Sequence, residues 1–435
     1  MNDIAKNVEQ EVAELKTIAK KYNVENNHLF QTLDAICSLS RRGQVVDRKL
    51  MDVECEIRKS IIQSSILGQY KSPYKLSEQN SVQKGAVVTS EFDYERALPP
   101  VCLERKMERD VSNKQWFKFL LVFRSGMSAM DSVLKLIVSL YAKQPKITIT
   151  TLVYYFELHS LLQLFFNNHW IEINHLTSID GFYKALQCAE SNVFIFESMD
   201  VYLKSKKIDI LELNNAIRRR NSKKPLIIIA DTTLCNSFFN IDTLLDGVES
   251  HVLLIGVRSA LKLDQQGLEL SNLGVVKVYS NVQSLPFEKI KKLLCDSRTL
   301  TGTTITSAEE YMLLSDLFSE QSTIRYTRQI LYNAKKLCDK VSGKHTCHIK
   351  SVRYQQDAPF FILELEDQKK YDDFISELLS FAKSKGVSIN IGTSFGFRHL
   401  RLEIIHHKTG CYIRISPGVY WGNDCECLID FLNNY

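Results

Sequence analysis

The chain of 435 residues is too long for one small domain and can bury a large core with an appended second domain. Its 55 basic and 50 acidic side chains leave a formal net charge of only +5, which argues against a nucleic-acid partner. The N-terminus lacks a secretion signal core, no stretch is apolar enough to span a bilayer, and the 11 cysteines show no CxxC spacing. We therefore expect a cytoplasmic protein with no membrane partner, no disulfide framework and no metal site.

The N-terminal residues 1–85 are expected to form a helical extension and a linker. Apolar side chains recur at steps of three and four residues in 4–22, and a second helical stretch covers 47–67. Between 69 and 92 the sequence changes to Ser, Lys, Gln and Gly, which is typical of a linker or an extended arm. We expect the apolar stripe to pack against the body of the protein or against a partner subunit.

Residues 86–290 are predicted to form a large α/β domain with a mostly parallel sheet. Strands and helices alternate there, and the strongest strands are nearly continuous apolar runs. These runs are 146–150, 192–196, 225–230 and 251–255. Such strands are typically covered on both faces, as in parallel sheets with crossover helices. Residues 291–435 begin with two helices, followed by several strands and a final helix, which predicts a smaller C-terminal α/β domain.

Two ionisable residues follow neighbouring predicted strands of the large domain. Asp231 comes directly after the apolar run 225–230, and Lys262 follows the next strand by a short loop. Functional side chains in parallel sheets gather beyond the carboxyl ends of the strands. Asp231 could bind a cationic ring nitrogen or could simply cap the next turn, and Lys262 considered alone resembles an ordinary surface lysine.

Two further features could bind anionic groups. Ser125-Gly126-Met127 opens a predicted helix, and amides at a helix start can bind phosphate where a glycine allows close approach. The same Ser-Gly pair is equally suited to an ordinary N-cap. Arg414 lies in an apolar strand-like run and needs a carboxylate or phosphate, from a structural ion pair or from a substrate. Together with Asp231 and Lys262, these features are what a pyridoxal-phosphate (PLP) site needs.

A series of short motifs contains these residues in a fixed order. The motifs are Tyr94-Glu95-Arg96 with Pro100, Ser125-Gly126-Met127-Ser128-Ala129, Val153-Tyr154-Tyr155-Phe156, Asp231-Thr232-Thr233, Ser259-Ala260-Leu261-Lys262, Ser394-Phe395-Gly396-Phe397 and Ile413-Arg414-Ile415-Ser416-Pro417-Gly418. The series resembles the fold-type I PLP enzymes of cysteine and methionine metabolism: cystathionine γ-synthase, cystathionine γ-lyase and methionine γ-lyase. The resemblance covers about residues 85–435 and implies a PLP-dependent transferase fold of type I, with the cofactor in the large domain.

The resemblance implies a role for each motif residue in the chemistry. Lys262 would carry PLP and act as general base, Asp231 would keep the ring nitrogen protonated, and Tyr154 would stack on the ring. Ser125, the amides of Gly126 and Met127, Ser259, and Tyr94 with Arg96 from the neighbouring subunit would anchor the phosphate, with Thr233 in the same cofactor-binding set. Arg414 and Ser394 would bind the amino-acid substrate, Arg414 through its α-carboxylate. Shared sites imply a homodimer or homotetramer.

The chain departs from the family at several motif positions. Val201 replaces an asparagine that would bond the ring hydroxyl, and Leu261 replaces a threonine before the lysine. Tyr155 and Phe156 replace two glycines after the stacking tyrosine. These changes indicate a divergent member with altered chemistry, as expected of an enzyme of specialised metabolism.

The sequence leaves the reaction open. The expected reactions are β- or γ-elimination and γ-replacement on a sulfur amino acid or an analogue, so the enzyme would be a lyase or a transferase. One alternative is a PLP-fold protein with other chemistry, such as an aminotransferase or an enzyme that forms carbon–carbon bonds. The other is a catalytically degenerate paralogue that uses its helical N-terminus for binding or assembly.

Overall fold

The chain folds into two compact units, which are described separately. The computed structural model describes residues 3–69, 80–83, 86–89, 99–111, 115–143, 146–188, 191–220, 222, 224–235, 239–249, 251–282, 286–342, 348–407 and 410–435. The large-sheet unit consists of Gln69–Leu261 and Ser271–Leu314, and the small-sheet unit consists of Met1–Gly68, Lys262–Leu270 and Ser315–Tyr435. The predicted domain boundaries at 85/86 and 290/291 stay a prediction.

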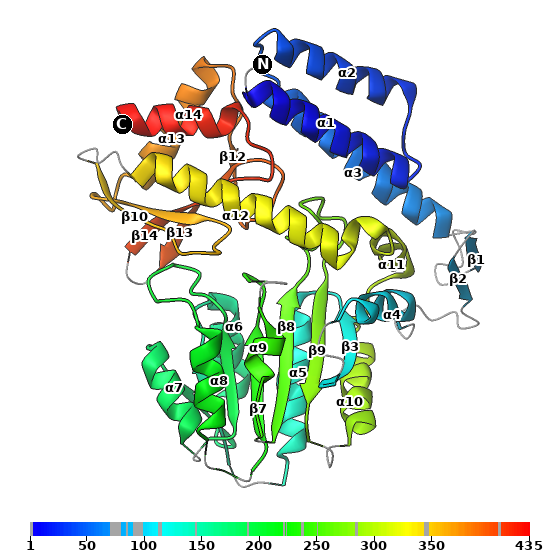
Figure 1. The fold of residues 1–435 in the computed structure, drawn as a ribbon, viewed down its shortest axis with the longest axis vertical. Coiled ribbons are helices and arrows are strands. Elements are labelled where there is room, and N and C mark those ends of the chain that lie inside the picture. The colour runs from blue at the N-terminus through cyan, green and yellow to red at the C-terminus, as the bar shows by residue number, and fades with distance from the viewer. Residues whose placement is uncertain are drawn as a thin grey trace. The chain divides into compact units, whose positions relative to one another are not determined.

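The large-sheet unit is built on a seven-stranded sheet with the strand order β3-β9-β8-β7-β6-β4-β5 (Figure 1). Its strands are β3 (Phe117–Phe123), β4 (Ile147–Leu152), β5 (Ile171–His175), β6 (Val193–Glu197), β7 (Leu226–Asp231), β8 (Val252–Ser259) and β9 (Gly274–Ser280). Among these strands, β9 runs in the opposite direction to the others, and the remaining neighbouring pairs are parallel. The apolar runs that predicted strands correspond to β4, β6, β7 and β8, so this part of the prediction is confirmed.

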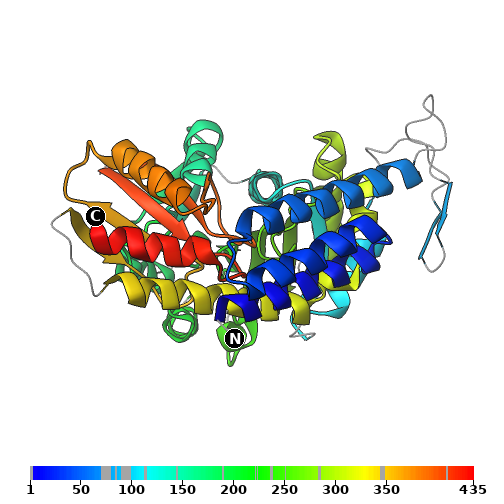
Figure 2. The same ribbon diagram turned by 90° about the horizontal axis from the view of Figure 1, so that it is seen from above.

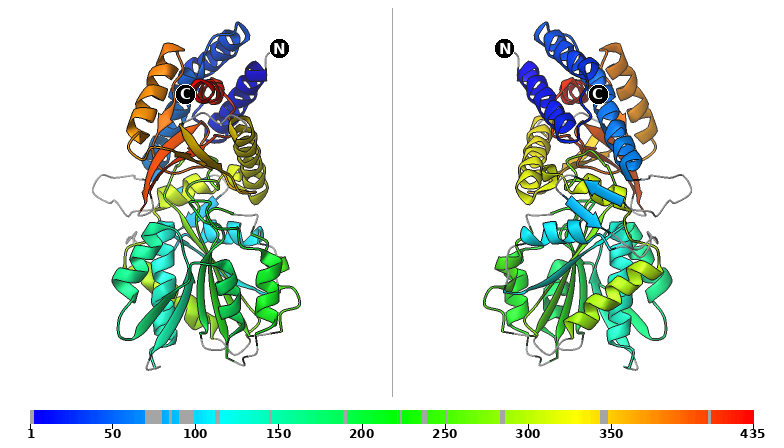
Figure 3. Two further views of the ribbon diagram at one scale, coloured as in Figure 1. Left: turned by 90° about the vertical axis from the view of Figure 1, so that its left-hand side faces the viewer. Right: turned by 90° about the vertical axis from the view of Figure 1, so that its right-hand side faces the viewer.

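Helices cover both faces of the seven-stranded sheet (Figure 3). Those of the unit are α4 (Val101–Arg109), α5 (Gly126–Leu140), α6 (Phe156–Leu161), α7 (Ile179–Gln187), α8 (Ile210–Arg218), α9 (Ile241–Leu245), α10 (Phe287–Leu300) and α11 (Ser307–Leu313), with a π-helical turn at Leu162–Phe166 and a hairpin of β1 (Asn80–Gln83) and β2 (Ala86–Thr89). Helices α5, α6 and α10 share one apolar core with the sheet. On the other face, Phe182 of α7 packs edge-on against Phe194 and Phe196 of β6.

The small-sheet unit contains a five-stranded sheet with the order β10-β11-β14-β13-β12. Its strands are β10 (Ile349–Arg353), β11 (Phe361–Leu365), β12 (Asn390–Ile391), β13 (Arg401–His407) and β14 (Gly410–Ser416). Helices α12 (Glu320–Ser342), α13 (Tyr371–Ser384) and α14 (Asn423–Asn434) pack on it around a second apolar core, and a short 3-10 turn covers Asp316–Phe318 (Figure 2). The predicted α/β fold class, a large mostly parallel sheet with a second smaller sheet, is confirmed.

Three N-terminal helices belong to the small-sheet unit. They are α1 (Asp3–Lys21), α2 (Asn27–Arg41) and α3 (Asp47–Gln69). The apolar stripe of α1 is buried, as its three- and four-residue spacing predicts, and α1 packs along α2 (Figure 2). Asn26 ends the intervening turn and accepts the backbone N–H of Leu29 at 2.7 Å, which caps α2. The apolar stripe therefore packs within this chain.

Candidate functional site

The start of α5 lies against the end of β8 in the large-sheet unit. A Cβ atom added to Gly126 would lie 3.0 Å from both Cα and Cβ of Ser259. A Cβ added to Gly274 would lie 2.0 Å from the carbonyl oxygen of Ser125. Glycine at these two positions thus permits backbone segments to approach more closely than any other residue would allow. This approach brings Ser125, Gly126 and Ser259 together.

The first turn of α5 presents backbone donors at this place. The Ser125 hydroxyl accepts the N–H of Ser128 at 3.0 Å, and the Ser128 hydroxyl accepts the N–H of Ser125 at 3.0 Å. This capping box satisfies two of the amides that a helix start leaves without intrahelical acceptors. Among the described residues, no acceptor is found for the N–H groups of Gly126 and Met127. These two amides are suited to an anion.

Asp231 is connected to this helix start through Thr233. Asp231 is the last residue of β7, and its Oδ1 accepts the backbone N–H of Thr233 at 2.9 Å. The Thr233 hydroxyl in turn accepts the backbone N–H of Ser259 at 3.0 Å. Two hydrogen bonds therefore join a half-buried carboxylate to the residue that lies against Gly126. Four residues of the predicted site therefore lie together at one edge of the sheet: Gly126, Asp231, Thr233 and Ser259.

Glu197 lies between Asp231 and the loop that carries Tyr154. It ends β6, directly opposite Asp231 in the parallel register, and is only 4% exposed. Its carboxyl oxygens accept the backbone N–H of Tyr155 at 2.8 and 3.0 Å. Burial and the neighbouring Asp231 raise the pKa of Glu197 well above its usual range, which favours the protonated form.

Tyr154 is a neutral phenol in this environment. Burial raises the pKa of its hydroxyl, the nearby Ser205 side chain acts in the opposite direction, and the charges of Asp200 and Glu197 raise the pKa further. Asp200 accepts the backbone N–H groups of Tyr202, at 2.8 Å, and of Ser205, also at 2.8 Å. The segment that contains Val201 is therefore an ordered turn built around Asp200.

In the small-sheet unit, Lys262 and Arg414 approach the same aromatic ring. The ammonium of Lys262 lies 4.5 Å from the ring centroid of Phe395, and the guanidinium carbon of Arg414 lies 5.8 Å from it. Ser394, the preceding residue, has a buried hydroxyl for which the described residues provide no hydrogen-bond partner. A Cβ on Gly396, whose φ is +83°, would lie 3.4 Å from Cβ of Lys262. Three predicted residues thus gather around Phe395.

Arg414 forms an ion pair with Glu403, a residue that the sequence analysis did not single out. The two residues face each other in the antiparallel register of β13 and β14, and their side chains are 12% and 19% exposed. Of the two partners considered for Arg414, the structure shows the structural ion pair. Counting outward from the His407–Gly410 pair of the hairpin would have identified Glu403 from the sequence.

Other predictions fall outside these two groups of residues. Tyr94 and Arg96, the predicted phosphate contacts from the neighbouring subunit, lie outside the described residues. Within the described ranges, no group of three or more His, Cys, Asp or Glu side chains is arranged to hold a metal ion. No helix in the described part of the chain combines the length and apolar character needed to cross a membrane.

Comparisons with known proteins give a class of fold. No protein-family model matches the chain. No curated protein sequence matches it either. Solved structures do match, at low sequence identity, so the chain shares their fold.

Three of the matching solved structures show the degree of similarity. CalE6, a methionine gamma lyase from Micromonospora echinospora, is 17% identical with a TM-score of 0.53 over 77% of this chain and 82% of its own. Cystathionine gamma-lyase from yeast is 14% identical with a TM-score of 0.58 over 86% and 98%. MetB from Corynebacterium glutamicum is 15% identical with a TM-score of 0.59 over 86% and 97%. The chain has the fold of these proteins.

Proposed function

We propose that the chain is a PLP-dependent enzyme that acts on an amino acid by β- or γ-elimination or by γ-replacement. The substrate would be a sulfur amino acid or an analogue from specialised metabolism. The observation that carries the proposal is the connection from Asp231 through Thr233 and Ser259 to the start of α5. It joins a carboxylate to a helix start, and PLP has a basic ring nitrogen and a phosphate. The shared fold supports the same assignment.

The residues present fit this cofactor. The N–H groups of Gly126 and Met127 with the Ser259 hydroxyl would bind the phosphate, and the close approach at Gly126 makes the space compact. Asp231 would pair with the ring nitrogen, and the raised pKa of the neighbouring Glu197 favours the neutral form of that second carboxyl group. Ser125 serves mainly as the N-cap, since its hydroxyl and amide are bonded to Ser128.

Lys262 would carry the cofactor and move protons at the substrate. It follows Ser259 by three residues, so chain connectivity keeps the amine near the phosphate-binding serine. PLP, when bound, supplies an electron sink that stabilises negative charge on substrate carbon atoms. Lys262 is the general base of the proposal, and Tyr154, a neutral phenol, would cover the ring and transfer protons.

Arg414 and Ser394 would bind the substrate. The buried Ser394 hydroxyl is available to a ligand atom within the described residues, and Arg414 would bind the α-carboxylate. The Glu403 carboxylate already occupies Arg414, so a substrate carboxylate must compete with it. This competition is the observation that favours the second candidate, a catalytically degenerate paralogue that binds rather than transforms a ligand.

We also propose a cytoplasmic homodimer or homotetramer, in which Tyr94 and Arg96 of one subunit reach the phosphate of the next. Equilibrium sedimentation at increasing protein concentration would measure the assembly. An oligomer that dissociates when Arg96 is replaced by alanine supports the shared site. A monomer at all concentrations contradicts it.

A titration with PLP tests the proposed function. Wild-type protein should gain a visible absorbance band on adding PLP, and Lys262→Ala should lose it. Lys292→Ala, an exposed lysine paired with Asp296, is the matched control and should behave as wild type. Release of ammonia and a 2-oxo acid from amino acids would then identify elimination, whereas transfer of the amino group would identify an aminotransferase. No band with wild-type protein would contradict the proposal.

A further inference from the structure

We propose that two N-terminal helices, α1 and α3, hold the loop that follows Lys262 in place, with Arg58 of α3 as its positioning residue. The loop comprises residues 262–270 and is called the lysine loop below. Its importance for catalysis depends on the proposed function, whereas its attachment to the helices does not. These helices thus contribute to the site that contains Lys262.

Arg58 binds the far end of the lysine loop. Its Nε donates to the carbonyl oxygen of Leu268 at 2.8 Å, and its Nη2 donates to the carbonyl oxygen of Glu269 at 2.7 Å. A guanidinium is planar and rigid, so two parallel bonds fix both carbonyl groups in orientation as well as position. The carboxyl group of Glu269 lies in the same surroundings: burial raises its pKa, and the nearby charges of Arg401, Arg58 and Lys262 act in the opposite direction.

Arg398 binds the middle of the loop and connects it to α1. Its guanidinium is fully buried and donates to both carboxyl oxygens of Glu11, at 2.6 and 2.8 Å, and to Glu14 at 2.8 Å. The same group donates to the carbonyl oxygen of Gln266 at 3.2 Å. A buried charge is tolerated only where its partners are complete, so the α1 carboxylates keep Arg398 in place beside the loop.

The backbone of the lysine loop needs such restraint. Gln266, Gly267 and Glu269 have φ angles of +52°, +75° and +45°, a region that residues other than glycine rarely adopt. A Cβ on Gly267 would lie 2.6 Å from the Tyr326 hydroxyl and 2.9 Å from the Arg398 amide nitrogen. The loop is therefore held in an uncommon conformation against the segment that contains Arg398.

Hydrogen bonds within the lysine loop connect its middle to Lys262. The N–H of Gly267 donates to the carbonyl oxygen of Lys262 at 3.4 Å, and the N–H of Gln266 donates to that of Leu263 at 3.2 Å. The carbonyl group that Arg398 binds belongs to Gln266, and the two that Arg58 binds follow within three residues. Movement of 266–269 would therefore change the backbone that bears Lys262.

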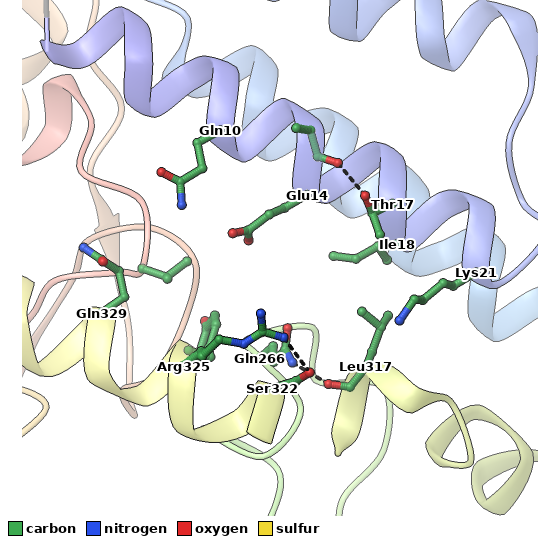
Figure 4. Close-up of a pocket in the computed structure, with 13 residues that line it drawn as sticks. Gln10, Glu14, Thr17, Ile18, Lys21, Gln266, Leu317, Ser322, Arg325 and Gln329 are labelled. Carbon is green, nitrogen blue, oxygen red and sulfur yellow. Dashed lines mark hydrogen bonds between the residues drawn. The ribbon is translucent and has the colours of Figure 1, made fainter. Parts of the chain in front are cut away.

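The lysine loop borders a cavity at Gln266. Gln266 lines a cavity of about 580 Å³ together with residues of α1 and α12 (Figure 4). Figure 4 shows Glu14 on α1 and Arg325 on α12 on opposite sides of this cavity. Hydrogen bonds hold the loop beside this cavity: the side-chain amide of Gln266 donates to the carbonyl oxygen of Leu317, and Arg398 donates to the carbonyl oxygen of Gln266.

Hydrogen–deuterium exchange in peptides that cover 262–270 tests the proposal without any cofactor. In Arg58→Ala we expect exchange of this loop to accelerate by at least about tenfold, because two charge-assisted hydrogen bonds are lost. Arg58→Lys keeps the charge but offers no planar fork, so it should show an intermediate effect. Arg48→Ala, an exposed arginine of the same helix paired with Asp52, is the control and should match wild type.

Two results would overturn the positioning role. One is wild-type exchange of the loop in Arg58→Ala while circular dichroism shows intact helices. The other, should Arg58→Ala unfold α3, is wild-type exchange in Arg58→Lys. Loss of bound PLP should be faster in Arg58→Ala than in Arg48→Ala. If wild-type protein takes up no PLP but the loop still exchanges faster in Arg58→Ala, the proposed function fails and the positioning role stands.

Discussion

Glu197 lies opposite Asp231 at the carboxyl ends of two neighbouring parallel strands. Two ionised carboxylates in such a place would repel each other, and burial adds to the cost of charging Glu197. Glu197 therefore favours its protonated form beside the half-buried Asp231. A carboxylate at the position of Asp231 is what a protonated ring nitrogen would require.

This pair predicts a pH-dependent stability that Glu197→Gln removes. The pKa of Glu197 is higher in the folded protein than its usual 4.5, so its contribution is fully present below that value. It is lost as the pH rises through the raised pKa, by at most about 1.4 kcal/mol per pH unit. Urea unfolding at a series of pH values should therefore show a smaller decline above pH 4.5 in Glu197→Gln than in wild type. An equal decline in both proteins would refute the assignment, and Glu172→Gln, an exposed residue paired with Lys146, is the control.

Thr233→Val should weaken both the fold and PLP binding. The substitution keeps the shape of the side chain but removes the acceptor of the Ser259 N–H. An unsatisfied backbone donor at this place should lower the free energy of unfolding by about 1–2 kcal/mol. Thr233→Ser retains the hydroxyl and should remain close to wild type. Denaturant unfolding and PLP titration measure the two effects, and identical behaviour of valine and serine variants would exclude the proposed link.

Gly126→Ala should separate the start of α5 from Ser259. The added methyl group would lie 3.0 Å from two atoms of Ser259, one of them in the backbone, so the segments must move apart. We expect a loss of about 1–3 kcal/mol in stability, as in other overpacked positions, and weaker PLP binding. Gly256→Ala is the matched control, since its nearest atom is 3.9 Å away. Thermal unfolding and PLP titration distinguish the two variants, and equal PLP affinities would argue against a phosphate site at Gly126.

The Arg414–Glu403 pair predicts how the site treats substrate carboxylates. In Glu403→Gln, the carboxylate that competes with the substrate for Arg414 is removed. KM for an α-amino acid should then fall about tenfold, which corresponds to about 1.4 kcal/mol. KM for the matching amine without the carboxylate should not change. Steady-state kinetics with the two compounds checks this, and equal changes for both would show that Arg414 does not bind the carboxylate.

The sequence predicted the elements whose residues carry a local pattern. Strands β6 and β7 are apolar runs buried on both faces, and Asp231 follows from its place at the end of such a run. The pairing of Arg398 with Glu11 could not be predicted, because 387 residues separate them and no periodicity links distant segments. The raised pKa of Glu197 depends on its register with Asp231, which only the sheet order reveals.

The bond between the cofactor and the protein tests the central claim most directly. Wild-type protein incubated with PLP would be reduced with borohydride, digested and mapped by mass spectrometry. We predict one reduced PLP adduct, on Lys262, and none on that peptide in Lys262→Ala. An adduct confined to other lysines, or no adduct with protein whose fold is intact, would contradict the account.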